Sequence, residues 1–484
     1  MLSVQSMHRI CIHAGGMFMV SFIIRALVFI FLIQPGDRYN QPDTPSYHEA
    51  ALSLSQGRGM YRADRQPIFW RTPGYPLYLA PFYSLYAPSG MQRPFDNYRT
   101  AHHVAIWVQI IFCSCIPILI FLLALLMSSD LGIALISGWF FVIHLGTVLA
   151  STFLLTEGIA MILFYSFLCM LFYQIIRATE WFDWSTIMCA FLLGAYTWIR
   201  PMGESIGVMS TVILIFFSPT SWLHSCKRAA FFLVLFALTL APWYVRNYQL
   251  TQDYFFCPVS GIYFTCFNVP KILRRTDGIS IEQAWKKSQQ NAQMVCLGAL
   301  QKCPPGVYLS PLSSKAAAMP VILAHPFWFA LDWSKEVVKT TFDLFSYQLV
   351  TLLNGCFSWD PIEEFLTEKY AACLYTHGTL PLWARICAWL ELCVMVACWA
   401  SIAYGICVFV VMPLIQCTDQ RFAFPRMSRV WWAAGILMAA TVGMTGGFGY
   451  ARLRLPIEPL IVILALIALQ KLISALRSSS LSIS

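Results

Sequence analysis

Asp43 is the first side chain whose sequence setting suggests chemistry. It lies in the run Pro-Asp-Thr-Pro-Ser-Tyr at residues 42–47, and the following stretch, Ser46 to Ser55, is expected to form a helix. The dipole of such a helix favours an ionised carboxylate just before its first turn, and a carboxylate held there can accept a proton from a hydroxyl group. An aspartate in this position is also common as a plain cap. The local pattern therefore leaves a general base and a structural cap as alternatives.

The composition indicates which elements must position this residue. Of the 484 residues, 58% are hydrophobic and only 11% are charged, and the mean hydropathy is +0.64. An ordinary soluble domain carries about a quarter charged residues, so soluble, disordered and low-complexity classes are excluded. A hydrocarbon core cannot satisfy loose backbone groups, so the long uncharged stretches must be helices. The sequence predicts an all-α polytopic membrane protein.

About ten stretches are long and apolar enough to be predicted as membrane helices. The clearest is the uncharged run from Thr100 to Ser129. An even number places both termini on one side of the membrane. The predicted helices lie near residues 10–34, 102–126, 132–149, 157–176, 185–199, 203–217, 229–245, 384–411, 430–446 and 457–473.

The distribution of Lys and Arg near the ends of these helices predicts the orientation. With the N-terminus inside, nine basic residues flank the inner ends of the helices and three flank the short outer turns. This bias favours two cytoplasmic termini. The expected location is a bacterial inner membrane. The chain then divides into a first, retained span (1–34), an extracytoplasmic loop (35–101), helices two to seven (102–245), a second extracytoplasmic loop (246–383), and helices eight to ten with a cytoplasmic tail (384–484).

The 17 cysteines fall into two groups under this topology. Eleven lie in spans or on the inner face and are predicted to be small packing residues. The other six lie in the second outer loop, where Cys257/Cys266 and Cys296/Cys303 are plausible local disulfides. Six cysteines allow fifteen pairings, and six free thiols remain the alternative. These six are Cys257, Cys266, Cys296, Cys303, Cys356 and Cys373.

A series of short motifs falls at the predicted outer boundary of the membrane, in a fixed order. Asp43-x3-Tyr47 and Arg-Thr-Pro-Gly-Tyr-Pro at 71–76 come first; Thr-Glu at 156–157, Ile-Arg-Pro at 199–201, Pro-Trp-Tyr-Val-Arg-Asn at 242–247 and Arg-Leu-Arg-Leu-Pro-Ile-Glu-Pro at 452–459 follow. This order resembles the GT-C glycosyltransferases, the membrane enzymes related to dolichyl-phosphate-mannose protein mannosyltransferases and bacterial aminoarabinose transferases.

The resemblance implies a GT-C-like fold and a sugar donor carried on a polyprenyl phosphate, with Asp43 as the catalytic base. One carboxylate suffices because a lipid phosphate leaves as a stable anion and mainly needs cations around it. A planar guanidinium suits bidentate phosphate binding. The arginines that could supply it are Arg71, Arg200, Arg246, Arg452 and Arg454.

Each substrate-binding candidate also has a structural interpretation. Arg452 and Arg454 could extend to lipid headgroups, and Arg246 could simply end a span. Glu157 could bind the acceptor or a metal, or could be an acid stabilised at a helix start.

Three further side chains could also have either a functional or a structural role. Tyr47 and Tyr75 are substrate-side candidates that could equally shape the loop. Arg25, inside the first span, needs a partner or a water-filled cavity.

The sequence also departs from the family pattern. Leu453 stands where an aromatic residue is usual, and no second acid accompanies Asp43. A divalent metal therefore stays an open option, no cofactor is certain, and no His/Cys/Asp group has metal-site spacing. The adjacent pair His102-His103 is assigned to packing at the membrane interface.

The second outer loop matches the family poorly between about Lys271 and Ser314. A helix is expected from Ser280 to Ala299, and an amphipathic helix lying on the membrane is expected from His325 to Val350. The resemblance implies that such loops cover the catalytic cavity and contribute to the choice of acceptor.

The predicted function is transfer of a sugar from a polyprenyl-phosphate donor to an acceptor hydroxyl at the extracytoplasmic face, with inversion at the anomeric carbon. The expected partners are the lipid donor, a lipid, glycan or protein acceptor, and membrane lipids, with no nucleic acid. A transporter or flippase of lipid-linked sugars is the competing prediction; broken helices, inverted repeats and a midplane site would favour it. A noncatalytic assembly subunit is a third, and the intact Asp43 argues against it.

Overall fold

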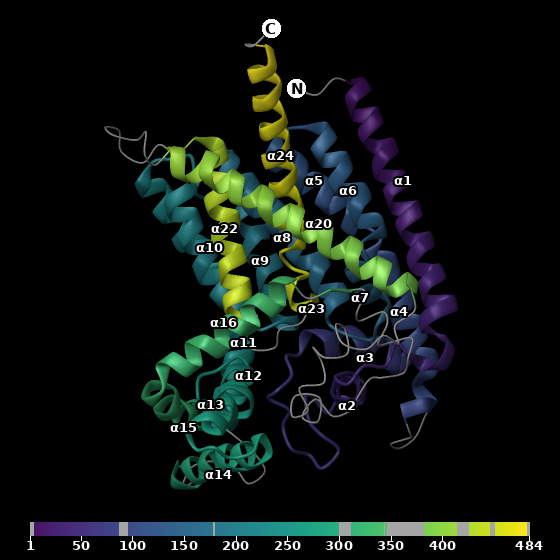
Figure 1. The fold of residues 1–484 in the computed structure, drawn as a ribbon. Helices are drawn as coiled ribbons and strands as arrows, with labels where there is room; N and C mark the ends of the chain where they lie inside the picture. The colour runs from purple at the N-terminus through teal and green to yellow at the C-terminus, as the bar shows by residue number, and fades with distance from the viewer. Residues whose placement is uncertain are drawn as a thin grey trace.

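The computed structural model describes residues 4–86, 95–177, 180–299, 311–342, 344–345, 382–413, 425–445 and 451–481. Figure 1 shows these residues as a bundle of long helices with a group of shorter helices at one end. Within the described ranges, the only bridge between extended residues joins Tyr61 and Pro67. The chain is therefore an all-α, multi-pass membrane protein, as its composition predicts.

Six helical segments of the described chain are long and apolar enough to cross a membrane. Each contains at least 20 residues, and a span needs about 20. They are formed by α1 (Val4–Val28) with the π-helical turn Phe29–Ile33, α4 (Arg99–Cys113) continued by α5 (Ile116–Ser128), α8 (Glu157–Ile176), α11 (Trp222–Thr251), α20 (Leu382–Ile406) with the turn Cys407–Val411, and α24 (Glu458–Leu481).

The other predicted spans are helical but do not all have full length. Helices α6 (Leu131–Ile143) and α7 (Leu145–Thr152) are bent by 47° and count as a seventh span only when taken together. Helices α9 (Trp184–Ile199) and α10 (Gly203–Phe217) have 16 and 15 residues, too few to cross without thinning the bilayer. Helix α22 (Arg426–Thr445) is not among the six. All ten predicted segments are thus helices, but fewer than ten are full spans.

Close approach between these helices depends on small residues. Gly194 of α9 faces α11 so tightly that an added Cβ would lie 2.1 Å from the Thr239 hydroxyl oxygen. Small residues allow such contacts between membrane helices, where van der Waals packing replaces the hydrophobic effect.

The shorter helices gather at the end of the bundle opposite both termini (Figure 1). Helices α2 (Thr44–Ser55) and α3 (Gly74–Tyr86) come from the first loop, and α2 confirms the helix predicted from Ser46 to Ser55. The second loop supplies α12 (Val259–Tyr263), α13 (Val269–Thr276), α14 (Ile281–Ala299), α15 (Pro311–Ala324) and α16 (Pro326–Phe342).

Helices α14 and α16 correspond to the two helices predicted in the second loop. Ion pairs connect α16 to α13: Arg275 lies 2.6 Å from Asp332, and Lys271 lies 2.7 Å from Glu336. Phe327 on α16 is 68% exposed, as a membrane-facing side chain would be. Contact with the membrane itself stays a prediction, and residues 346–350 of the predicted helix lie outside the described residues.

The disulfide predicted between Cys257 and Cys266 is not formed. Both are free thiols. The Cys257 thiol donates a hydrogen bond to the Trp70 carbonyl at 3.7 Å, while Cys266 lies within the π-helical turn Phe264–Asn268. Three of the other cysteines lie outside the described residues: Cys303, Cys356 and Cys373. The side chain of Cys296 is also not described.

Candidate active site

Asp43 occupies the N-cap position of α2 but does not act as a cap. Its side chain makes no capping hydrogen bond with the helix backbone. The Ser46 hydroxyl instead donates to the Asp43 carbonyl oxygen at 2.6 Å. The Asp43 carboxylate is therefore not engaged by the helix, and the interpretation of Asp43 as a plain helix cap is excluded.

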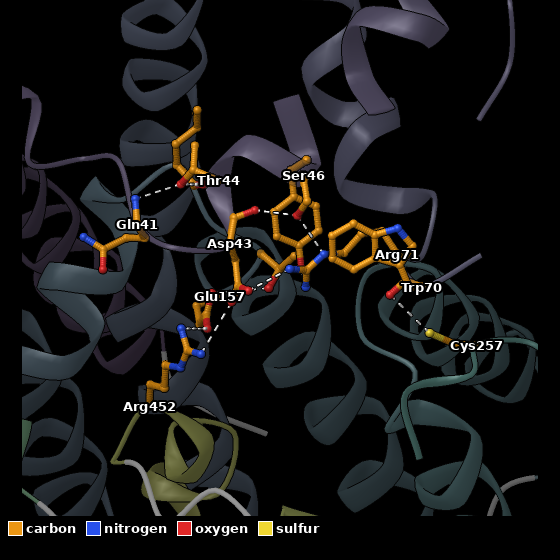
Figure 2. A network of polar contacts seen from close by, with 12 residues as sticks. Gln41, Asp43, Thr44, Ser46, Trp70, Arg71, Glu157, Cys257 and Arg452 are labelled. Atoms are coloured by element: carbon orange, nitrogen blue, oxygen red, sulfur yellow. Dashed lines mark hydrogen bonds and ion pairs between the residues drawn. The ribbon is translucent and has the colours of Figure 1, made fainter. Parts of the chain in front are cut away.

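Arg71 holds the Asp43 carboxylate on one side (Figure 2). Its Nη2 lies 2.7 Å from Asp43 Oδ1, and it donates further hydrogen bonds to the Ser46 hydroxyl at 2.8 Å and the Tyr47 hydroxyl at 3.2 Å. Its guanidinium also contacts the rings of Tyr47 and Trp70, at 4.6 and 4.7 Å from their centroids. These contacts give Arg71 a single defined orientation.

The segment that carries Arg71 is anchored to the end of α9. The Thr72 hydroxyl donates to the Ile199 carbonyl at 2.7 Å. Gly74 lies against the same helix end, where an added Cβ would be 2.6 Å from the Trp198 carbonyl oxygen. The Arg-Thr-Pro-Gly motif thus places Arg71 beside Asp43 because only glycine allows this approach.

Arg452 reaches Asp43 from the far end of the sequence. It lies on the short helix α23 (Ala451–Arg454), with its Nη2 3.5 Å from Asp43 Oδ2 and its Nη1 4.0 Å from Glu157 Oε1. Figure 2 shows the Arg452 guanidinium facing both carboxylates, with a dashed line to Asp43. Its side chain is 35% exposed, so it is the more accessible of the two arginines that contact Asp43.

Glu157 and Arg200 form the inner part of the cluster. Arg200 Nη2 lies 2.5 Å from Glu157 Oε1, and their side chains are 14% and 7% exposed. The Thr156 hydroxyl donates to Glu157 Oε2 at 3.2 Å and accepts from Arg200 at 3.4 Å. Glu157 therefore serves mainly to hold Arg200, with Arg452 as a more distant partner.

The arginines around Asp43 keep its carboxylate ionised. Burial raises the pKa of Asp43, but the charges of Arg71, Arg452 and Arg200 and the Arg71 hydrogen bond outweigh it and lower the pKa to about 2. The carboxylate is therefore fully charged near neutral pH. Its contribution to folding stability is present above the ordinary aspartate pKa of about 4 and is lost as the pH falls towards 2.

A shallow hollow, open to the surroundings and with room for about one water molecule, lies beside the cluster. Its accessible surface is almost entirely apolar. The residues around it are Glu157, Ala160, Met161, Phe164, Tyr196, Arg200, Arg452, Leu455 and Pro456.

Two of the predicted arginines do not join this cluster. Arg246 donates to the carbonyls of Met60 and Ile68, at 3.0 and 3.4 Å, and lies over the Trp243 ring. Arg454 is fully buried, pairs with Glu458, and donates to carbonyls of α16. These contacts favour a structural role for Arg246 and Arg454 over phosphate binding.

The two predicted tyrosines lie at different depths. Tyr47 contacts Arg71 directly through its hydroxyl and its ring. Tyr75 is completely buried and packs edge-on against Tyr47, with its hydroxyl 3.4 Å from the Gln109 amide oxygen. Tyr75 therefore supports Tyr47 rather than facing the hollow.

Arg25 approaches another helix and not the Asp43 loop. It is fully buried in α1 and donates to the Thr147 hydroxyl of α7 at 3.3 Å and to the Ser21 carbonyl at 3.4 Å. It thereby ties the first span to the bent pair α6–α7.

Ser46 and Trp70 also contact Arg71, and neither contact was predicted from the sequence. Trp70 directly precedes Arg71, is 40% exposed and lies beside the site. An aromatic next to a motif arginine is a usable signal for such a contact. Among the described residues, no group of three His, Cys, Asp or Glu side chains could hold a metal ion.

Replacing Arg246 with Met is expected to destabilise the first loop. The loss would take one donor from each of the Met60 and Ile68 carbonyls. The Met60 carbonyl keeps the Ile68 N–H as a donor at 2.9 Å, so a cost of about 1–3 kcal/mol is expected for the Ile68 carbonyl where it stays buried. Thermal unfolding of the detergent-solubilised protein should show a lowered midpoint. Arg58→Met, at an exposed position of the same loop, is the control and should leave the midpoint unchanged; equal midpoints for the two variants would contradict the structural role of Arg246.

Comparison with known proteins yields no match to a family model and none to a curated protein sequence. Two solved structures match this chain over most of its length. One is the archaeal oligosaccharyltransferase AglB from Archaeoglobus fulgidus in complex with an inhibitory peptide and a dolichol-phosphate, with a TM-score of 0.48, 11% identity and coverage of 96% of this chain. The other is ArnT from Cupriavidus metallidurans in the apo state, with a TM-score of 0.33 and 14% identity over 91% of this chain.

This chain covers 51% of the AglB chain and 78% of the ArnT chain, so it spans about half the length of the first.

Proposed function

We propose that the protein is an integral-membrane glycosyltransferase that moves one sugar from a polyprenyl-phosphate donor to an acceptor hydroxyl, with Asp43 as the base. The observation that carries this proposal is the ionised Asp43 carboxylate surrounded by Arg71, Arg452 and Arg200 at one end of an apolar helix bundle. These residues come from four separate segments of the chain. Their convergence supplies the one acid and several cations that the reaction needs.

The proposed step is a direct displacement. The acceptor oxygen bonds to the anomeric carbon while the bond from that carbon to the phosphate oxygen breaks, and its electron pair leaves with the lipid phosphate. The acceptor proton passes to Asp43. Arginines stabilise the departing phosphate, so no second carboxylic acid is required, and the configuration at the anomeric carbon inverts.

The proposed location of the reaction is the extracytoplasmic face. The bias of Lys and Arg favours cytoplasmic termini, and the site lies with the loop helices at the end opposite the termini (Figure 1). The division into loops at 35–101 and 246–383, the bacterial inner membrane, and a lipid, glycan or protein acceptor belong to the same proposal.

A flippase of lipid-linked sugars is the second candidate, and the bent pair α6–α7 is the feature that favours it, because transporters use broken helices. The charged cluster, however, is built by α2, α8, α23 and the segments beside them. At the bend, Arg25 donates to the Thr147 hydroxyl, and the His144 ring accepts from the Thr147 backbone N–H. Transfer of a sugar therefore explains more of the charged residues of the cluster than transport of the lipid does.

The proposal is tested with purified protein and a panel of polyprenyl-phosphate sugars. The expected result is release of the polyprenyl phosphate and transfer of the sugar, to water where no acceptor is supplied, with inverted anomeric configuration. Movement of intact donor between the leaflets of liposomes, without any release of carrier phosphate, would instead support the flippase.

A further inference from the structure

His48 of α2, Tyr83 of α3 and His102 of α4 meet at one point outside the Asp43 cluster, and are called the histidine cluster below. His48 Nδ1 and His102 Nε2 each lie 2.9 Å from the Tyr83 hydroxyl oxygen, and the two nitrogens are 3.3 Å apart. His48 is 8% exposed, and the other two side chains have no exposed surface. The proposed transfer reaction assigns these buried, titratable groups no role.

Aromatic rings surround the His48 imidazole. The ring centroids of Phe95, Tyr98 and Tyr83 lie 4.8, 4.9 and 5.2 Å from it. The titratable groups that face His48 are thus Tyr83 from α3, Tyr98 from the turn before α4, and His102 from α4. Among the described residues no charged side chain shifts its pKa, and burial lowers that pKa from 6.5 to about 4. The imidazole is therefore neutral at pH 7.

The hydrogen bonds of the histidine cluster are complete only while both imidazoles are neutral. One ring nitrogen then donates to the Tyr83 oxygen, and the Tyr83 hydroxyl donates to the other ring nitrogen. An added proton puts a hydrogen on both nitrogens, so the Tyr83 hydroxyl loses its acceptor and a charge appears among aromatic rings. The cluster therefore stabilises the packing of α2 on α3 and α4 when it is neutral and opposes that packing when it is charged.

The same short helix presents the catalytic groups to Arg71. Asp43 is the N-cap residue of α2, and Tyr47, next to His48, contacts Arg71 through its hydroxyl and its ring. Helix α2 has only 12 residues, about three turns. A movement of His48 out of its cluster would therefore shift Tyr47 and Asp43 as well.

We propose that His48 is a positioning residue: its neutral ring holds α2 where Asp43 meets Arg71, and protonation of the ring releases the helix and stops transfer. This inference rests on the proposed function and adds a lower pH limit to it. His48 sets that limit because its pKa of about 4 lies above the value of about 2 to which the arginines lower the pKa of Asp43. Acidification therefore releases α2 while the base is still ionised.

Hydrogen exchange of the full-length protein in detergent tests the release without any substrate. The His48 ring regains its ordinary pKa of about 6.5 once α2 opens, so the stability that it contributes is full above about pH 6.5 and is lost as the pH falls towards 4. The protection of the α2 amides, corrected for the intrinsic exchange rate, should fall about tenfold or more between pH 7 and pH 5.

His48→Asn is the variant for this measurement, because its amide keeps a hydrogen-bonding group near the Nδ1 position but does not titrate. Its α2 protection should fall by less than about threefold over the same pH range. Equal losses in the variant and the wild type, or no loss in the wild type, would overturn the proposal.

The pH profile of transfer tests the link to Asp43. The acidic limb of polyprenyl phosphate release by the wild type is expected near pH 4, and His48→Asn should move it down by about one unit or more, towards the pKa of Asp43. Tyr83→Phe should move the limb up, because without the hydroxyl a protonated ring can donate to the other imidazole at 3.3 Å. A limb that stays in place in both variants would overturn the positioning role.

His325→Asn is the control for both measurements. His325 lies between α15 and α16, outside the histidine cluster, and this variant should keep the wild-type limb and the wild-type α2 protection. The two measurements also separate the inference from the proposed function. Release of α2 by acid in a protein that transfers no sugar would support the role of His48 in holding α2 and refute the transferase. Transfer by a protein whose α2 protection does not change with pH would refute the role of His48 alone.

Discussion

Replacing Asp43 with Asn is expected to abolish sugar transfer while the protein still folds. The amide cannot accept the acceptor proton, and loss of a general base slows a reaction by about 10²- to 10⁴-fold. Folding should survive because Asp43 provides no helix cap and the amide oxygen of Asn can still accept a hydrogen bond from Arg71. The check is the rate of polyprenyl phosphate release, with the thermal unfolding midpoint measured on the same preparation.

Asp37→Asn is the matched control for this result. Asp37 lies in the same loop, pairs with the exposed Arg99 and does not line the hollow. This variant should transfer sugar at close to the wild-type rate. Undiminished transfer by Asp43→Asn, at a normal level of folded protein, would rule out Asp43 as the base.

Glu458→Ala is expected to cause the largest loss of stability. Glu458 is the carboxylate partner of Arg454, a side chain with no exposed surface. Removing one member of a buried pair leaves an uncompensated charge and costs about 3–5 kcal/mol. Arg454 also donates to the carbonyls of Thr340 and Thr341, at 2.9 and 2.8 Å, so its displacement would loosen α16 from the segment that carries Arg452. The unfolding midpoint in detergent and the donor KM should both change.

The chain offers a close control for this variant. Glu282 and Lys286 form another pair four residues apart on a helix, but both side chains are 63% exposed. Glu282→Ala should therefore leave the unfolding midpoint nearly unchanged. The double variant Arg454→Met with Glu458→Leu should recover part of the stability, because no unpaired buried charge remains. A Glu458→Ala protein as stable as Glu282→Ala would show that the buried pair is not needed.

The apolar segments could be predicted closely from the sequence because their signal is local. The stretch predicted at 157–176 is α8, Glu157–Ile176, and each other predicted span falls on one helix or on two consecutive helices. The number of full spans was not predictable in the same way. The helix bends at His144, where no proline or glycine in the sequence indicates a bend. Helices α9 and α10 are short because the chain turns between them, at Arg200 and Pro201.

The candidate site could be predicted only in part. Asp43 and Arg71 are close in sequence, and motif order was enough to nominate both. The contacts of Arg452 could not be predicted, since 409 residues separate it from Asp43. Arg246 and Arg454 carry the same sequence signal as Arg200 and Arg452, an arginine at the end of an apolar helix, and yet they bind backbone carbonyls.

The sequence by itself determined that this chain must be a bundle of apolar helices with most of its polar residues in two long loops, because backbone groups in a membrane have no other partners. It also determined which acid and which arginines were candidates. Only the tertiary structure decided which of them meet. Whether an arginine at a helix end faces a carboxylate or a carbonyl depends on how neighbouring helices pack, and packing is a property of residues far apart in the chain.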